Sequence, residues 1–238
     1  LEDARTNNSG RDCQQGSYLG PYFSKETVNR FLVKKNYVYH EMKSAERART
    51  IAKLIAEGKI VGYMAGRMEF GPRALGARSI LADAANPRMQ SRINRKIKFR
   101  ESFRPFAPSV LKEYISDYFE IDRQSPYMLL VCQVKEGRQV PAITHVDYSA
   151  RVQTVAREDH PRYYDLIKAF EDLTGYGIII NTSFNVRGEP IICTPEDAYR
   201  CFMRTEMDYL VIGNFFLEKK KQASWQERTD WKQDFTLD

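Results

Sequence analysis

The stretch GRMEFGPRALGARSILADAANPRMQSRINRKIKFRESFRPF, residues 66–106, carries most of the basic character of this chain. It contains ten lysines and arginines against three acidic residues, whereas the whole chain of 238 residues has a net charge of +6. The remaining sequence is therefore close to neutral. Several of these arginines lie beside Gly, Pro or Phe, and guanidinium groups held by such rigid neighbours suit a bidentate grip on phosphate or carboxylate. The stretch predicts a site for a small polyanion such as a nucleotide, with a nucleic acid backbone as the alternative.

Helical and strand patterns alternate around this stretch. Apolar residues at helical spacing, with Asn, Thr, Pro and Gly as start and stop signals, indicate helices. The expected helices cover residues 45–57, 87–97, 112–120, 162–174 and 195–204, and the expected strands cover residues 60–65, 79–82, 128–134, 151–155, 177–181 and 209–216. Because these elements do not follow strict β-α-β alternation, we expect an α/β (α+β) fold with a mixed sheet.

The two ends of the chain differ from its centre. Residues 1–43 are expected to form a lead-in, with a short helix after Ser24 that docks through Phe31 and Leu32. Residues 44–218 are expected to form the compact domain, and residues 219–238 a polar C-terminal tail with two tryptophans. A polar start without Met indicates a chain cut from a longer protein, and no signal peptide or membrane-spanning run of about 20 apolar residues is expected.

The cysteines and histidines indicate neither a disulfide framework nor a metal site. The four cysteines lack CxxC spacing, which fits a reducing, cytoplasmic setting. The three histidines lie far apart in sequence, so no metal site built from His and Cys is expected. His145 has two interpretations, a general base or a structural histidine.

Polar and charged side chains outside the basic stretch add candidates for the same site. Arg151 lies in an apolar strand, so we expect it to be partly buried and paired either with an internal acid or with an anionic ligand. Asn181 and Ser183 follow three isoleucines, and the end of a buried strand is a common ligand site. Turn capping is the alternative for both. Arg187 is expected to pair with Glu189 or to reach this site.

The sequence contains no GxxxxGK[ST] phosphate loop, no GxGxxG after a strand and no GxSxG elbow. Phosphate would therefore be held mainly by side chains, each charge-assisted bond contributing about 1.5–3 kcal/mol. The expected donors are Arg73, Lys98, Arg104, Arg151, Asn181 and Ser183. For the other basic residues of the 87–97 helix a solvated surface is favoured. Catalysis at such a site would be positioning and charge stabilisation of phosphoryl or adenylyl transfer, with Mg²⁺.

Five ordered blocks resemble a known family, the C-terminal region of the carbamoyltransferases, which include nodulation protein U and the cephem and tobramycin enzymes. The blocks are GRMEFGPRALGARSILADAANPRMQSRIN, KFRESFRPFAPSVL, SARVQTV, GIIINTSFNVRGEPI and DYLVIGNFFL. The resemblance runs over residues 18–218 and implies a YrdC-like domain, a twisted mixed sheet flanked by helices. It also implies that ATP and carbamoyl phosphate are used to form carbamoyl adenylate. An N-terminal domain with a His-ligated iron, which this chain lacks, would pass the carbamoyl group to an acceptor hydroxyl.

The resemblance assigns roles to the same candidates. Arg73 and Arg151 match positions that hold carbamoyl phosphate, Lys98 and Arg104 match cations on the nucleotide phosphates, and Asn181 with Ser183 completes the pocket. Arg73, Lys98 and Arg104 are the expected catalytic residues, with Arg78, Gln153 and Arg187 as a second tier. The expected cofactors are ATP and Mg²⁺, with iron only in the missing domain. The expected partners are carbamoyl phosphate, an acceptor hydroxyl compound and the missing N-terminal domain in cis.

The alternative to this enzyme is a YrdC-like module that binds RNA or another nucleic acid without catalysis. The basic composition permits it. The positive charge is concentrated in one stretch rather than spread along a groove, which disfavours a nucleic acid partner.

Overall fold

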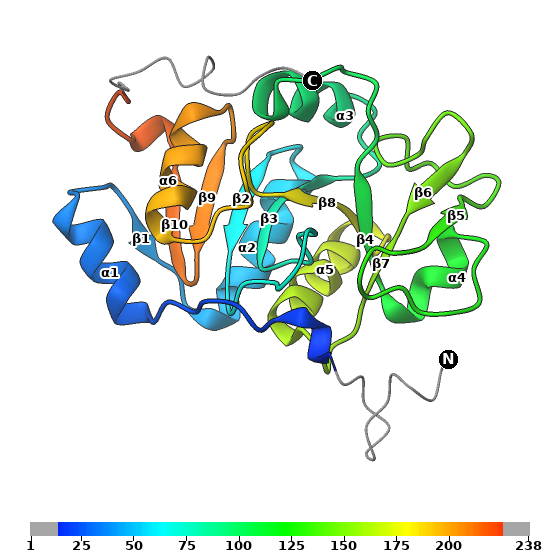
Figure 1. The fold of residues 1–238 in the computed structure, drawn as a ribbon, viewed down its shortest axis with the longest axis horizontal. Helices are drawn as coiled ribbons and strands as arrows, with labels where there is room; N and C mark the ends of the chain where they lie inside the picture. Colours follow the sequence, from blue (N-terminus) through cyan, green and yellow to red (C-terminus); the bar gives the residue numbers. More distant parts are fainter. Residues whose placement is uncertain (1–13, 226–238) are drawn as a thin grey trace.

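An eight-stranded mixed sheet forms the centre of the molecule (Figure 1). The computed structural model describes residues 14–225. The strands, in their order across the sheet, are β1 (His40–Glu41), β10 (Phe215–Glu218), β9 (Tyr209–Ile212), β2 (Val61–Met64), β3 (Arg78–Asp83), β8 (Ile178–Ser183), β4 (Ala107–Leu111) and β7 (Gln153–Val155). β2 and β9 pair in parallel, as do β4 and β7, and the antiparallel pairs include β2 with β3 and β8 with both β3 and β4. The expected mixed sheet is confirmed.

Helices cover both faces of this sheet. The α-helices are α1 (Lys25–Lys34), α2 (Ser44–Ala56), α3 (Met89–Ile93), α4 (Ile115–Tyr118), α5 (Pro161–Thr174) and α6 (Pro195–Arg204). Buried residues of α2 and α5 form one hydrophobic core, and those of α1, α3, α4 and α6 belong to the other. Within β8, Ile178 and Ile180 face the second core and Ile179 faces the first, as the two-residue period of a strand requires.

Three expected helices are confirmed, and their ends follow from their capping residues. α2, α5 and α6 coincide with residues 45–57, 162–174 and 195–204 to within one residue at each end. α5 ends at Gly175, whose φ of 82° is a left-handed value that glycine adopts readily. α6 begins with a capping box in which Thr194 and Asp197 exchange side-chain and backbone hydrogen bonds.

Several strands differ from the sequence prediction. The strand expected over residues 209–216 is the hairpin of β9 and β10, because the chain turns at Gly213 and Asn214. The strand expected over residues 151–155 is interrupted at Val152, whose N–H donates to Leu130 O (3.2 Å). Its first part, β6 (Ser149–Arg151), pairs with β5 (Val131–Gln133) in a separate two-stranded sheet, and its second part is β7. β4, which includes Pro108, was not predicted.

The helix expected over residues 87–97 begins later and changes its geometry. The side chain of Asn86 accepts from Arg88 N–H (3.0 Å), and the α-helical part is only α3. The chain continues as a π-helical turn over Asn94–Lys98 and ends at Phe99, which has a left-handed φ of 48°. Lys98, expected just beyond the helix, is therefore the last residue of this turn. The helix expected over residues 112–120 is a 3₁₀ turn over Lys112–Tyr114 followed by α4.

The lead-in contributes to the same sheet and core. Ser24 caps α1 by accepting from Thr27 N–H (3.2 Å), and Leu32 is fully buried, so the expected helix and docking residue are confirmed. β1 adds an edge strand beside β10. Of the C-terminal tail, Trp225 packs edge-on against Tyr199, and residues 226–238 lie outside the described part.

Candidate active site

The GPRALGAR segment forms a loop between β2 and β3 with Arg73 on its exposed outer side. Buried side chains hold the inner side of this loop through its carbonyl groups. Asn181 Nδ2 donates to Ala74 O (3.2 Å), and Gln153 Nε2 donates to Leu75 O (2.8 Å). The loop is therefore bonded to β8 and β7. These bonds fix the backbone from which the side chain of Arg73 projects.

Asn181 and Gln153 also bind each other. Asn181 Nδ2 donates to Gln153 Oε1 (2.8 Å), which accepts a second bond from Ser109 Oγ (2.6 Å). Asn181 and Gln153 are 1% and 2% exposed, so neither offers a free surface to a ligand. Their hydrogen bonds support the loop that carries Arg73, a role that the sequence did not indicate.

Arg73 and Arg151 form a pair of cations that no acid neutralises within residues 14–225. Partial desolvation lowers the pKa of Arg151, and the positive charge of Arg73 lowers it further, so the charges of the two guanidinium groups act on each other. Neither has a carboxylate within 4 Å among the described residues. Arg151 is exposed at the surface although its guanidinium group is partly desolvated, and no internal acid pairs with it among the described residues; of its two expected partners, the internal acid is therefore not seen, and the anionic ligand stays a prediction. It is exposed because it lies opposite Val131 in the small sheet, outside the main core. Two interacting cations without an acid are typical of an anion site.

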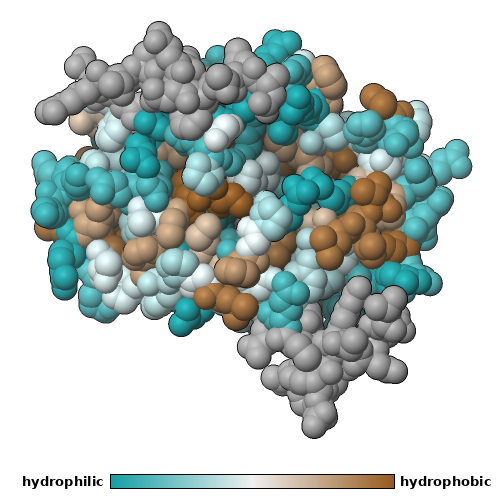
Figure 2. Space-filling view, viewed as in Figure 1, coloured by the Kyte–Doolittle hydropathy of each residue, from teal (hydrophilic) through white to brown (hydrophobic). Residues whose placement is uncertain are grey.

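A groove of about 180 Å³ passes beside Arg151. It is lined by Pro105, Phe106, Ala107, Val131, Ile143, His145, Ser149, Ala150 and Arg151. Leu129 and Val131 are 72% and 63% exposed, and Figure 2 shows hydrophobic residues gathered over the end of the molecule that carries β5 and β6. The site therefore combines a cationic pair with an apolar wall.

Lys98 is buried beneath the end of β8. Its Nζ donates to Asn185 Oδ1 (2.7 Å), Ser183 O (2.5 Å) and Asn185 O (3.1 Å), with Ser183 Oγ at 3.2 Å. Burial lowers its pKa to about 7. Only 3% of this lysine is exposed, so it holds the 183–185 turn in place and brings positive charge close to Ser183. Lys98 and Ser183 are in contact, as expected for residues of one site. Lys98 is more deeply buried than its sequence position indicates.

Three further arginines follow the π-helical turn and β8. Arg104 Nε pairs with Glu101 (2.9 Å), and its side chain remains 46% exposed. Burial lowers the pKa of Arg100, and the charges of Arg104 and Arg187 lower it further while Glu101 opposes them. The charges of the predicted Arg104 and Arg187 thus both act on Arg100, a cation that sequence reasoning missed. Arg187 was expected either to reach this site or to pair with Glu189. In the structure Glu189 forms an ion pair with Arg204.

Arg78 is fully buried and binds backbone carbonyls. Nη1 donates to Ala77 O (3.0 Å) and Gly66 O (3.3 Å), and Nη2 donates to Pro21 O (3.2 Å). These bonds join the loop to the lead-in. Such a residue supports the site from within.

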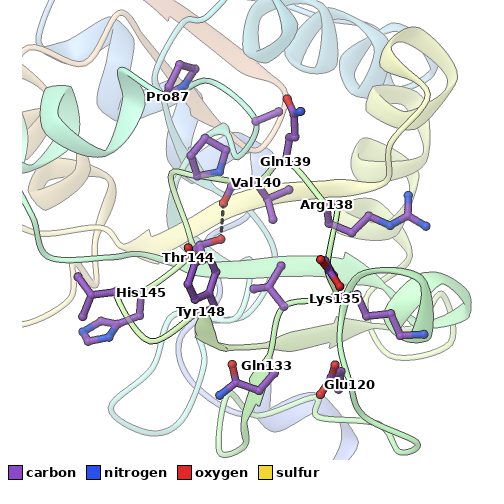
Figure 3. Close-up of a pocket in the computed structure, with 16 residues that line it drawn as sticks. Pro87, Glu120, Gln133, Lys135, Arg138, Gln139, Val140, Thr144, His145 and Tyr148 are labelled. Atoms are coloured by element: carbon purple, nitrogen blue, oxygen red, sulfur yellow. Dashed lines mark hydrogen bonds between the residues drawn. The ribbon is translucent and has the colours of Figure 1, made fainter.

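His145 lies at a second and larger hollow, about 990 Å³, formed mainly by residues 133–148 (Figure 3). Its Nδ1 lies 3.1 Å from Asp147 Oδ1, and its side chain is 47% exposed. Hydrogen bonds from Ser149, followed by that with His145, lower the pKa of Asp147. Figure 3 also shows Thr144 donating to Val140 O (2.8 Å) at the wall of this hollow. His145 lines the groove of Arg151 as well, and it joins the two hollows.

No group of three or more His, Cys, Asp or Glu side chains within residues 14–225 is arranged to hold a metal ion. The candidate site is composed mainly of cationic and neutral side chains, with Glu101 as the acid paired with Arg104. In the same part of the chain no helix has the length and apolarity needed to cross a membrane.

Residues 52–219 match the family model described as carbamoyltransferase C-terminus. The chain is 52% identical to uncharacterized protein sll1178 of Synechocystis over 95% of its own length and 41% of that protein. It is 47% identical to nodulation protein NolO of Bradyrhizobium diazoefficiens (79% of this chain, 35% of that protein). It is 38% identical to 3'-hydroxymethylcephem-O-carbamoyltransferase of Streptomyces clavuligerus (69% and 31%). The chain thus spans less than half the length of these relatives.

Among solved structures, the fold is similar to that of P. abyssi Sua5 complexed with L-threonine, with a TM-score of 0.54. The match covers 74% of this chain and 48% of that chain at 19% identity. At this identity the likeness concerns the fold alone, and it confirms the YrdC-like architecture expected from the sequence.

Proposed function

Because this chain belongs to the carbamoyltransferase C-terminus family, we propose that it binds ATP and carbamoyl phosphate and forms carbamoyl adenylate. The observation that carries this proposal is that Arg73 and Arg151, whose charges act on each other, have no acid as an ion-pair partner among the described residues, and that Arg151 lines the groove of about 180 Å³. Two guanidinium groups match the charge and the planar oxygen geometry of a phosphate.

The proposed reaction has two balanced steps. A water oxygen attacks the phosphorus of carbamoyl phosphate, the bond from this phosphorus to the carbamoyl oxygen breaks, carbamate leaves, and inorganic phosphate retains the protons of the water. A carbamate oxygen then attacks the α-phosphorus of ATP, the bond from this phosphorus to the bridging oxygen breaks, and pyrophosphate leaves. Both steps move charge between phosphate oxygens, so fixed cations can lower the barrier by electrostatic stabilisation.

In this proposal, different residues act on the two substrates. Arg73 and Arg151 would bind the phosphate of the carbamoyl donor. Arg104 and the charge of Lys98 would act on the ATP phosphates, with Ser183 as a neutral donor at the end of β8. Mg²⁺ would enter with ATP, held by the phosphate oxygens. Transfer to an acceptor hydroxyl, and the iron that this transfer would use, belong in our proposal to a domain that the relatives possess beyond the region matched here.

The test is to incubate the 238-residue chain with MgATP and carbamoyl phosphate and to follow carbamoyl-AMP and pyrophosphate by mass spectrometry. We expect product only when both substrates are present. Arg73→Ala should lower the rate about 10- to 150-fold, since each charge-assisted bond contributes about 1.5–3 kcal/mol. Arg95→Ala removes an exposed arginine of the same basic stretch and serves as the matched control.

Three outcomes would contradict the proposal. Product that forms equally in Arg73→Ala would remove the assigned role of this arginine. ATP binding without any product would mean that this chain alone does not catalyse the step. RNA binding that weakens steeply with salt, without ATP binding, would favour the nucleic acid module.

A further inference from the structure

Glu69 is a buried carboxylate within the loop that carries Arg73. It is 4% exposed, although it lies only four residues before an exposed arginine. Its Oε1 accepts three backbone N–H groups, from Leu75 (2.7 Å), Ala77 (2.6 Å) and Arg78 (3.2 Å). Bonds from several N–H groups to one ionised oxygen are among the stronger ones that a protein makes. This carboxylate therefore closes the loop on itself, from residue 69 to residue 78.

The carbonyl groups of the same segment are bound from outside the loop. Leu75 O accepts from Gln153 Nε2 and from the hydroxyl of Tyr18, both at 2.8 Å, and Ala74 O accepts from Asn181. Glu69 thus binds the N–H side of residues 75–78 while other side chains bind the carbonyl side at residues 74 and 75. With both sides bonded, the backbone directly after Arg73 is fixed, and within residues 69–78 only the outer edge, Phe70 to Arg73, is exposed.

Arg78 provides the electrostatic counterpart of Glu69. The negative charge of Glu69 acts on Arg78 and opposes the effect of burial on its pKa. The two groups do not bond to each other directly, because Arg78 gives its Nη atoms to carbonyls of residues 21, 66 and 77. Glu69 Oε2 and Arg78 Nε are buried without a hydrogen-bond partner in the described structure. Burying such groups without a partner costs stability, and the bonds that Glu69 Oε1 and the Arg78 Nη atoms make must offset that cost.

We propose that Glu69 is the positioning residue of the anion site, which holds the loop that carries Arg73 in the shape from which Arg73 acts together with Arg151 on an anion. The charges of the two guanidinium groups repel each other, so without ligand the loop would tend to move Arg73 away from Arg151. The three bonds to Glu69 oppose that movement and keep the cationic pair preformed. A preformed site binds its ligand without a further ordering cost. This inference rests on the proposed function for the identity of the ligand, carbamoyl phosphate.

The test compares Glu69→Gln with the unsubstituted chain and with Glu206→Gln, which removes a carboxylate of 62% exposure. Glutamine keeps the shape of the side chain, but its amide binds the three N–H groups without the charge. We expect backbone hydrogen exchange at Leu75, Ala77 and Arg78 to become at least tenfold faster in Glu69→Gln. In the control it should not change. Equal exchange in all three proteins would overturn the proposal.

Binding of carbamoyl phosphate separates positioning from a general loss of structure. Glu69→Gln should weaken binding about tenfold, equivalent to about 1.4 kcal/mol. In an Arg73→Ala background the same substitution should cost little more, because Glu69 acts through Arg73. Additive losses would overturn the assignment.

If the unsubstituted chain fails to bind carbamoyl phosphate, the proposed function is contradicted, and hydrogen exchange at residues 75–78 still decides the role of Glu69. If Glu69→Gln does not fold, the same exchange and binding measurements on Glu69→Asp, which retains the charge on a shorter side chain, replace it.

Discussion

At the scale of single residues, the cations of the candidate site differ most in burial. Arg73 is exposed and keeps its donors available to a ligand, whereas Lys98 is 3% exposed and directs its donors to the 183–185 turn. The sequence predicted both as phosphate-binding residues because charge and spacing can be read from a sequence, whereas burial cannot. Burial depends on neighbours from distant parts of the chain, and here β8 provides them. The same limitation explains why buried Glu69 was overlooked.

The burial of Lys98 makes stability depend on pH in a defined direction. Its pKa is about 7 in the folded protein against an ordinary value of 10.5. Between these values the folded protein binds fewer protons than the unfolded chain, so the free energy of unfolding should rise as pH increases from about 7 to 10.5. The slope contributed by one such group is at most about 1.4 kcal/mol per pH unit.

Urea unfolding at pH 7, 8 and 9 measures this effect. The unsubstituted chain should gain stability relative to Lys98→Met as the pH rises. Lys96→Met, which removes an exposed lysine two residues earlier, is the control and should keep the slope of the unsubstituted chain. Parallel curves for the unsubstituted chain and Lys98→Met would contradict the lowered pKa.

At the scale of elements, the loop between β2 and β3 depends on Gly76. Its φ is 108°, a value that disfavours other residues, and an added Cβ would lie 2.3 Å from the ring of Tyr163. This ring belongs to α5 and its hydroxyl donates to Ser109 in β4, so it cannot move freely. The close packing of the loop on α5 therefore requires glycine at this position.

Gly76→Ala should destabilise the protein by about 1–3 kcal/mol and weaken anion binding, because the loop must leave its place on Tyr163. Gly71→Ala is the matched control, since φ there is 135° but an added Cβ meets nothing within 4 Å. Urea unfolding of both variants separates the steric clash from backbone strain. Equal losses in the two variants would show that contact with Tyr163 is unimportant.

The sequence predicted elements well where local signals determine them. α5 and α6 have capping residues and periodic apolar faces, and both lie where they were expected. It failed where tertiary pairing determines the outcome. Pro108 lies within β4, where it pairs with Ile180 of the neighbouring strand β8. β6 ends before Val152 because the N–H of Val152 donates to Leu130 O. The π-helical turn that buries Lys98 likewise has no local signal that we recognise.

At the scale of the whole molecule, the lead-in is joined to the loop that carries the candidate site. Gly20 N–H donates to Met68 O, and Met68 N–H donates to Pro21 O, both at 2.9 Å. Arg78 binds the same Pro21 carbonyl. The sequence placed the start of the compact domain at Ser44, yet these bonds and the buried face of α1 connect residues 18–43 to the centre of the molecule.

A chain that starts at Ser44 should therefore be less stable than one that starts at Gln14. Removing α1 exposes the core surface that Val28 and Leu32 cover, and each such side chain contributes about 1.5–3 kcal/mol when buried. The shortened chain also loses β1 and the backbone bonds to Met68, so the loop that carries Arg73 should become less ordered. We expect a loss of at least about 3 kcal/mol in urea unfolding and faster hydrogen exchange at residues 68–78. The chain that starts at Gln14 retains every contact described for the lead-in and serves as the reference. Equal stability of the two shortened chains would instead place the domain boundary at Ser44, as the sequence predicted.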